Sequence, residues 1–294
     1  AEALAQVPGW FADWEQHLSR FRADSELMRL NGAGGRPQPV SAVLWEVLAA
    51  AVDAYQRSDG LVSPTLLAAL EAAGYDQSFD ALLAPPVAGA ALALRPETDP
   101  APTLTLDIAD PLAAIVRDEA ARTVQLLDGV QLDLGGVAKG WAAEQAARRL
   151  AGCGPALVEA GGDIAVSGPR QDGAPWPIGV ADPHLPAADA AVLALSRGGV
   201  ATSGRDYRRW QQGGVWRHHI LDPRTGQPAV TDVLSATVVA PSLRDAELAA
   251  KAALILGSEE GLAWIEAAPD WAALLILDNG LLVESRRLAA YRVG

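Results

Sequence analysis

Apolar residues recur at helical intervals in the first part of the chain. Residues 8–30 carry one apolar stripe with a spacing of three or four residues, which is typical of an amphipathic helix. The stripe consists of Trp10, Trp14, Leu18 and Phe21. A stretch rich in glycine and proline follows, and Ser41 then offers an N-cap for a second apolar helix that ends near Arg57.

From residue 103 onward, short segments alternate apolar and polar residues, which is typical of strands. Turn residues between these segments predict antiparallel pairing. We expect strands at 103–108, 123–129, 130–136, 156–160, 164–168, 176–181, 191–196, 198–202, 215–221, 234–240, 272–277 and 281–285. Helical spacing predicts further helices at 138–150, 245–257 and 258–267.

Blocks of helices beside antiparallel strands predict an α+β fold with antiparallel sheets flanked by helices. No wholly polar linker divides the chain, so we expect a single domain over residues 1–294. The Ala/Pro-rich segment 78–103 is expected to be a peripheral loop.

Composition excludes some classes of function. The chain carries 36 acidic and 23 basic residues, a net charge of −13, which argues against a nucleic-acid-binding surface. The single cysteine, Cys153, excludes an internal disulfide and is expected to be buried. No apolar run is long enough to span a membrane. We expect a cytoplasmic protein, or an exported or membrane-associated one if a signal has been removed from its N-terminus.

Lys251 interrupts a helix that is apolar nearly all round. Such a helix is normally buried, and a buried ammonium without a partner is costly. Glu247 lies four residues earlier, so the two side chains are expected to meet on one face. This pair is either a solvated surface pair or part of an internal site.

Two glycine-containing segments could bring backbone N–H groups close to an anion. Gly135 and Gly136 precede Lys139 at the start of a predicted helix, which favours anion binding but also fits an ordinary strand–turn–helix. The segment Gly161–Asp163 is either a hairpin turn or a second backbone-amide surface with a carboxylate for a ligand hydroxyl.

Two further segments carry side chains suited to a phosphate-containing ligand. Residues 202–204 read Thr-Ser-Gly and are followed by three arginines, which suits a pyrophosphate or ribose but also a solvated turn. His218 and His219 are adjacent near a predicted strand end, so only one can face a given site. That histidine could shuttle a proton, or it could simply be packed for shape.

The order of these motifs carries more information than any one of them. The segments "SRFRADSELMRLN", "DLGGVAKGW", "ALVEAGGDI", "VATSGRDYRRW", "HHILDPRTGQPA" and "SATVVAPSLRDAELAAKAALILG" occur in sequence between about residues 10 and 260. In this order they resemble the ApbE family of FAD:protein FMN transferases. The resemblance implies a T-fold-like α+β domain that binds FAD. Active relatives move the FMN half of FAD onto a threonine or serine hydroxyl of an acceptor flavoprotein and release AMP.

The resemblance also implies roles for individual residues. Asn31 would contact the flavin, and Tyr55 or Trp141 would stack on a ring of FAD. Gly135, Gly136 and Lys139 would lie on the pyrophosphate side. His219 would assist the acceptor hydroxyl, and Asp222 with Thr225 would shape its turn. The remaining matches to cofactor-binding loops are Gly161, Gly162, Asp163, Thr202, Ser203 and Gly204.

The chain departs from the family pattern where active relatives hold Mg²⁺. Relatives use a backbone carbonyl, here that of Gly136, with an Asp and a Thr at the positions of Glu247 and Lys251; Ser63 also stands where an Asp is common. We hypothesise that the Lys251 ammonium, anchored by Glu247, replaces the metal ion. The competing interpretation is that Gly136 and Glu247 bind Mg²⁺ with waters. Flavin transfer is the favoured function; the alternatives are FAD hydrolysis to FMN and AMP, or FAD binding without catalysis.

Overall fold

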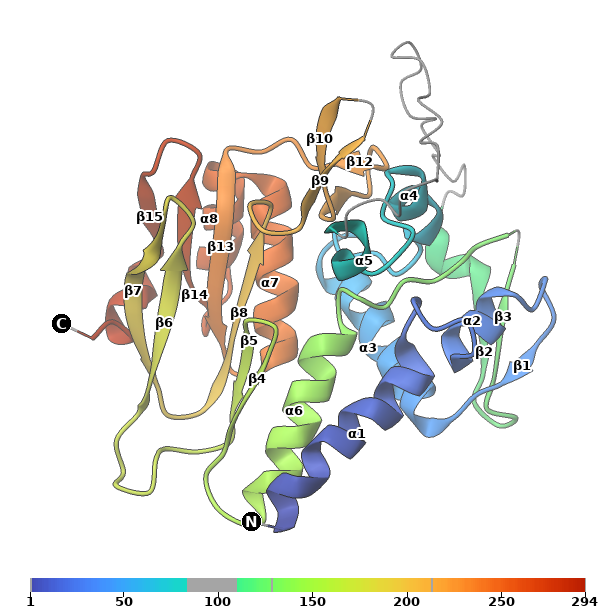
Figure 1. The fold of residues 1–294 in the computed structure, drawn as a ribbon, viewed down its shortest axis with the longest axis horizontal. Coiled ribbons are helices and arrows are strands. Elements are labelled where there is room, and N and C mark those ends of the chain that lie inside the picture. The colour runs from blue at the N-terminus through green and yellow to red at the C-terminus, as the bar shows by residue number, and fades with distance from the viewer. Residues whose placement is uncertain (1, 84–109, 128, 213, 294) are drawn as a thin grey trace.

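A six-stranded antiparallel sheet forms the centre of the molecule (Figure 1). The computed structural model describes residues 2–83, 110–127, 129–212 and 214–293. The strand order is β15-β14-β13-β8-β5-β4. These strands are β4 (Leu157–Ala160), β5 (Asp163–Val166), β8 (Gly198–Gly204), β13 (Val233–Ala240), β14 (Ala272–Leu277) and β15 (Leu282–Glu284).

The two faces of this sheet are covered differently. Helices α6 (Ala138–Ala151), α7 (Leu243–Leu256) and α8 (Ser258–Ala267) cover one face, and the hairpin β6 (Trp176–Asp182)–β7 (Leu185–Leu195) with the short helix η2 (Arg286–Ala290) covers the other (Figure 1). All six residues of β14 are buried. Because both faces are covered, the central strands are continuous apolar runs rather than alternating ones.

Helix α7 packs closely on the sheet because small residues face it. A side chain at Gly199 of β8 would collide with the Leu243 backbone, so only glycine allows this approach of strand and helix. Alanines on α7 supply most of the remaining buried surface.

The N-terminal third adds a second layer against α6 (Figure 1). Its helices are α1 (Glu2–Leu18), α2 (Glu26–Asn31), α3 (Ala42–Arg57), α4 (Leu67–Ala72), α5 (Phe79–Leu83) and the 3₁₀ helix η1 (Pro111–Ala114). A three-stranded sheet joins β1 (Gln38–Pro39), β3 (Thr123–Leu126) and β2 (Ile115–Asp118). Two small hairpins complete the described fold: β9 (Arg209–Gln212) with β10 (Val215–His218), and β11 (Leu221–Asp222) with β12 (Gln227–Pro228).

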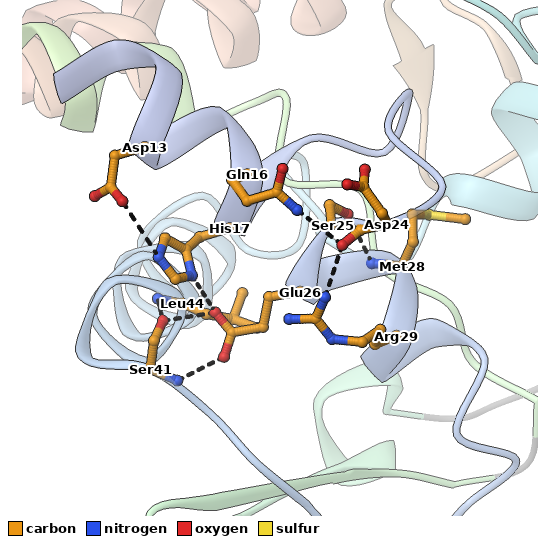
Figure 2. Close-up of polar contacts among 10 residues, drawn as sticks. All are labelled: Asp13, Gln16, His17, Asp24, Ser25, Glu26, Met28, Arg29, Ser41 and Leu44. Atoms are coloured by element: carbon orange, nitrogen blue, oxygen red, sulfur yellow. Dashed lines mark hydrogen bonds and ion pairs between the residues drawn. The ribbon is translucent and has the colours of Figure 1, made fainter. Parts of the chain in front are cut away.

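Glu26 joins α1, α2 and α3 (Figure 2). Its carboxylate accepts the backbone N–H and the hydroxyl of Ser41, both at 2.6 Å, and His17 Nδ1 donates to it at 2.6 Å. Burial acts to raise the pKa of Glu26, but the hydrogen bonds from Ser41 and His17 outweigh it and lower this pKa. The buried carboxylate is therefore ionised and fully bonded.

The α+β prediction is confirmed, and the later helices and most strands lie close to their expected positions. The first helix is wrong in extent. It ends at Leu18 and a new helix starts at Glu26, so Phe21 lies outside the stripe and is 43% exposed. Ser25 explains the new start, because its side chain accepts the N–H of Met28 as an N-cap.

The strand predicted at 130–136 is absent from the described structure. This segment bonds instead to side chains and to a loop, as the site geometry below shows. Cys153 is exposed rather than buried. Residues 79–83 of the expected peripheral loop form α5, whereas 84–103 and the expected strand 103–108 lie outside the described residues.

Within the described residues, no helix has both the length and the apolar character needed to cross a bilayer.

Candidate active site

A cleft forms where three segments meet: the glycine loop (residues 132–137) before α6, the middle of α7, and the segment after β10. Its polar lining comes from Ser63, Asp133, Gly136, His219 and Lys251. Its apolar walls include Leu61, Val62, Leu66, Leu70, Val137, Ile220 and Leu221. The cleft therefore combines a few convergent polar groups with an apolar surround, which is typical of a small-molecule site.

The glycine loop is held by contacts from distant parts of the chain. Asn31 bonds to both backbone groups of Leu132, accepting its N–H at 2.8 Å and donating to its carbonyl at 2.9 Å. The N–H of Asp133 donates to Pro64 O at 2.8 Å, and its carboxylate accepts the N–H of Gly135 at 3.0 Å. These contacts replace the strand ladder expected at 130–136. They also use both polar atoms of the Asn31 amide to brace the loop.

Three elements bring Lys139, Asp163 and Thr202 together. Lys139 Nζ forms an ion pair with the carboxylate of Asp163, which is 1% exposed. The same carboxylate accepts the N–H of Thr202 at 3.3 Å. In the register of β8 and β13, Thr202 lies opposite Thr237, and their hydroxyls are hydrogen-bonded at 2.8 Å. The predicted residues of the first, second and third loops thus meet at one place.

Glu247 and Lys251 do not form the direct pair that their spacing predicts. Among the described side chains, no ion pair within 4.0 Å joins them. Glu247 is 4% exposed and accepts the N–H of Gly140 at 3.1 Å, at the start of α6. Lys251 extends toward the glycine loop, where its Nζ lies 2.5 Å from the position that a Cβ on Gly136 would occupy. Tertiary contacts have separated the two groups. The buried Glu247 is therefore not part of a solvated surface pair, and it does not hold the Lys251 ammonium by direct contact.

Both glycines at the start of α6 make room for these charged groups. A Cβ on Gly140 would lie 2.5 Å from Glu247 Oε2, just as one on Gly136 would lie against Lys251. Side chains at these positions would push the ends of Glu247 and Lys251 out of place.

Burial and neighbouring charges act in opposite directions on this cluster. Burial raises the pKa of Glu247, with the Asp163 carboxylate adding to the rise. Burial lowers the pKa of Lys251 despite the opposing effect of Glu247 and other carboxylates. For Lys139, burial acts to lower the pKa, but Glu247 and Asp163 together raise it. Lys139 is therefore the firmly charged cation.

His219 and His218 have different surroundings. His219 lines the cleft, whereas His218 Nε2 lies 3.2 Å from Ala229 O and does not line it. Burial lowers the pKa of His218 to about 4. Burial, Arg208 and Lys251 hold the pKa of His219 well below its ordinary value. His219 is thus neutral near pH 7, and its Nδ1 has no hydrogen-bond partner among the described residues. A neutral imidazole can accept a proton.

Several predicted cofactor-binding residues also have partners within the protein. The N–H of Gly162 donates to Glu159 at 2.6 Å, so the Gly161–Gly162 turn is closed by its own strand. Asp222 forms an ion pair with Arg224 at 2.8 Å and holds the following turn. Neither Gly161 nor Asp222 lines the cleft.

The two aromatic candidates also lie elsewhere. Tyr55 lies on α3, and its ring packs over Gly60, which follows the helix. It does not line the cleft. Trp141 is 5% exposed and packs edge-on against Trp14 in the core. Ser203 is buried in the sheet beside Thr202, and the following Gly204 packs against Asp206. Trp141 is therefore part of the core, whereas Tyr55 is half-buried outside the cleft.

Sequence reasoning missed Asp133 and Arg20, and it noted Arg208 only as one of the three arginines after residues 202–204. Asp133 lines the cleft, and its carboxylate forms an ion pair with Arg20 in which Nε and Oδ2 are 2.8 Å apart. Arg208 acts on His219 and Lys139 through its charge. The signal for Asp133 was present, since a carboxylate two residues before a glycine pair can accept the N–H of the first glycine and close the loop on itself. The contact from Arg20, 113 positions earlier, has no local signal.

The residues around Gly136 and Glu247 do not fit a magnesium ion as they are placed. The Lys251 amine occupies the space beside Gly136, and a second cation there would be repelled. Glu247 already accepts a backbone N–H. Within residues 2–83, 110–127, 129–212 and 214–293, no three His, Cys, Asp or Glu side chains gather in a way that could hold a metal ion.

Comparison with known proteins gives one consistent result. A model of the ApbE family matches residues 3–275. A protein from Treponema pallidum named FAD:protein FMN transferase is 33% identical over 291 residues, which cover 94% of this chain and 77% of that protein. One of the same name from Haemophilus influenzae is 29% identical over 294 residues, covering 95% and 80%. The crystal structure of an ApbE protein from Thermotoga maritima superposes with a TM-score of 0.83 at 26% identity, covering 100% of this chain and 92% of that one.

Proposed function

The chain belongs to the ApbE family and is an enzyme of the flavin-transferase kind, and we propose that it moves the FMN moiety of FAD onto a threonine or serine hydroxyl of an acceptor flavoprotein. The observation that supports this best is the cleft itself. It places a neutral histidine, His219, close to a lysine whose amine lies against the glycine loop. Phosphoryl-type transfer needs a proton acceptor and positive charge, and both are supplied here.

The proposed reaction is an in-line displacement at the FMN phosphorus. The acceptor hydroxyl oxygen forms a bond to that phosphorus, and the bond from phosphorus to the oxygen bridging to AMP breaks. His219 takes the hydroxyl proton, and AMP leaves with the bridging oxygen. Lys139 and Lys251 face the negative charge that develops on the phosphate oxygens, because both extend from elements that border the glycine loop.

Lys251 would serve as a fixed cation where relatives place Mg²⁺. Its amine lies beside Gly136, and Asp133, Asp163 and Glu247 all act to keep it protonated against the effect of burial. The alternative, in which Mg²⁺ binds to the Gly136 carbonyl and Glu247, requires Lys251 to move away first. Such a Mg²⁺ ion would polarise the phosphate oxygens.

The deciding experiment incubates the protein with FAD, with and without an acceptor protein, and measures AMP. Release of AMP that depends on the acceptor, together with covalently bound flavin on it, supports transfer. Equal release without an acceptor identifies an FAD pyrophosphatase. Binding of FAD without AMP identifies a non-catalytic binding protein. Repeating the assay with Mg²⁺ or with EDTA separates the fixed-cation hypothesis from a metal-dependent one.

A further inference from the structure

Arg20 lies between α1 and α2 with a side chain that is 5% exposed. Its guanidinium contacts two rings that are edge-on to each other, with its carbon 4.1 Å from the centre of Phe21 and 4.5 Å from that of Tyr75. Stacking of this kind fixes the plane of the guanidinium. The direction of every N–H group on Arg20 is therefore set.

Two of the nitrogens of Arg20 reach different segments, one that lines the cleft and one that packs beside His219. Nε pairs with Asp133 Oδ2 at 2.8 Å, and Nη1 donates to Tyr75 O at 2.8 Å. Nη2 is buried without a hydrogen-bond partner in the part of the chain that the structure describes. Leaving a buried donor unpaired costs stability. Arg20 is thus poorly explained as a residue kept only for stability.

The contact with Asp133 controls the glycine loop. Asp133 uses one carboxylate oxygen for Arg20 and the other for the N–H of Gly135. The next residue, Gly136, lies against the amine of Lys251. Arg20 therefore fixes the wall on which the phosphate groups are proposed to lie.

The contacts with Tyr75 connect Arg20 to His219, which lines the cleft. The Tyr75 ring stacks on Trp210 with centres 5.2 Å apart, and its centre lies 6.3 Å from that of His219 in an edge-on arrangement. Trp210 is itself fixed, since its Nε1 donates to Ala73 O at 2.9 Å. Arg20 therefore reaches the proposed proton acceptor through a single ring.

We propose that Arg20 is a positioning residue that sets the separation between the phosphate-binding wall and His219. The inference rests on the proposed transfer reaction. Each wall survives without Arg20, so FAD binding persists, whereas in-line attack depends on how the two walls are placed relative to each other. A misplacement of about 1 Å can cost a rate of about 10²-fold.

The test compares Arg20→Met and Arg20→Lys with a matched control, Arg22→Met. Arg22 is two residues away, is 41% exposed and pairs only with exposed carboxylates. For Arg20→Met we expect the kcat of transfer to fall about 10²-fold while the Kd for FAD, measured by calorimetry, changes less than about threefold. Arg20→Lys keeps a charge toward Asp133 but loses the fork, so it should recover only part of the rate. The control should match the wild type.

Asp133→Asn provides a second variant if Arg20→Met folds poorly, because it weakens the same pair while keeping the shape of the side chain. Its effect and that of Arg20→Lys on kcat should be less than additive. Parallel loss of rate and FAD affinity, or full additivity, would overturn the inference.

A readout that needs no catalysis separates this inference from the proposed function. The imidazole NMR signals of His219, assigned by comparison with His219→Ala, should shift in Arg20→Met and not in Arg22→Met. Unchanged signals would refute the positioning role even if the wild type proves inactive. A wild type that releases no AMP would refute only the transfer reaction.

Discussion

Glu26 and Glu247 are both buried glutamates, yet their surroundings have opposite effects on their charge. Glu26 is 9% exposed and accepts hydrogen bonds from Ser41 and His17, which outweigh the effect of burial and lower its pKa. Glu247 is 4% exposed, accepts one backbone N–H and lies near another carboxylate, so burial and Asp163 raise its pKa. Burial is similar, but the number of donors and the neighbouring charges differ.

The difference distinguishes a structural junction, in which the buried charges are fully hydrogen-bonded, from a site in which the buried charges are only partly compensated. At the junction every charge has a partner, which fixes three helices. In the cleft, charges of both signs are buried with incomplete partners, and their pKa values are displaced in opposing directions. Displaced pKa values of this kind cluster at functional sites. The comparison therefore predicts that substitutions in the cleft change activity, whereas those at Glu26 change stability.

The largest effect is expected for His219→Ala. Loss of a general base lowers kcat by about 10²–10⁴-fold, while FAD affinity stays near that of the wild type because the base acts in the transition state. Rates of flavin transfer and calorimetry with FAD measure the two quantities. The control His218→Ala should retain most of its activity, since His218 does not line the cleft. A parallel loss of binding and rate would make His219 a simple contact residue.

Lys139→Met should lower the rate by about 10²-fold and also weaken FAD binding, because the firmly charged cation is lost. It also leaves Asp163 buried without its ion-pair partner. Arg148→Met is the matched control: it lies on the same helix, and its side chain is 58% exposed. Normal kinetics in Lys139→Met would place the phosphate groups elsewhere.

Stability should depend on Glu26 more than on Glu247, the reverse of what is expected for activity. Glu26→Ala should lower the free energy of unfolding by about 3 kcal/mol, since it leaves the Ser41 N–H and His17 without their acceptor. Glu247→Gln should leave stability unchanged or slightly higher at pH 7, because it removes a charge whose pKa is raised by burial. Urea denaturation measures both. The exposed Glu15→Ala serves as the control for Glu26. An equal loss in both variants would contradict the comparison.

The same two residues should differ in how pH affects their contributions. The folded pKa of Glu26 is lowered, so its stabilisation is present above about pH 4.5 and is lost as the pH falls through the folded value. The folded pKa of Glu247 is raised, so its contribution is present below about pH 4.5 and is lost as the pH rises through the folded value. The stability difference between wild type and Glu26→Gln should therefore shrink in acid. Any gain in the free energy of unfolding that Glu247→Gln has over the wild type at pH 7 should disappear in acid.

The smallest effect concerns the metal. Lys251→Thr combined with Glu247→Asp introduces the Thr and Asp that the family resemblance implies at a metal site and should make transfer several-fold dependent on Mg²⁺. Titration of Mg²⁺ against activity, with Ca²⁺ as a control, measures this. A wild type that already loses its activity in EDTA would count against a fixed cation at Lys251.

Sequence reasoning predicted those parts of the molecule that depend on local pattern. Helices α6 and α8 follow from periodicity, because their apolar faces are buried as the pattern requires, whereas the central strands follow from short apolar runs between turn residues. The glycine loop and the separation of His219 from His218 also follow from local spacing.

What failed depends on contacts between distant residues. The spacing of Glu247 and Lys251 predicts a pair, but Gly140, 107 positions earlier, supplies a donor that holds the carboxylate elsewhere. The strand at 130–136 was displaced in the same way, because Asn31 takes the backbone groups of Leu132. Hydrophobic periodicity and intrinsic propensity do not predict which distant group will form such a hydrogen bond.

The two glycines at the start of α6 have a consequence for motion. Gly136 and Gly140 are four residues apart and receive Lys251 and Glu247, which are also four residues apart on α7. Two charged side chains of α7 therefore fill the space beside two glycines of segment 136–140. Sliding α7 along this segment by one turn would push a charged group against its backbone. A shear of α6 against α7 would therefore have to displace both charged side chains from these positions. Closure by elements outside this pair of helices would leave both contacts in place.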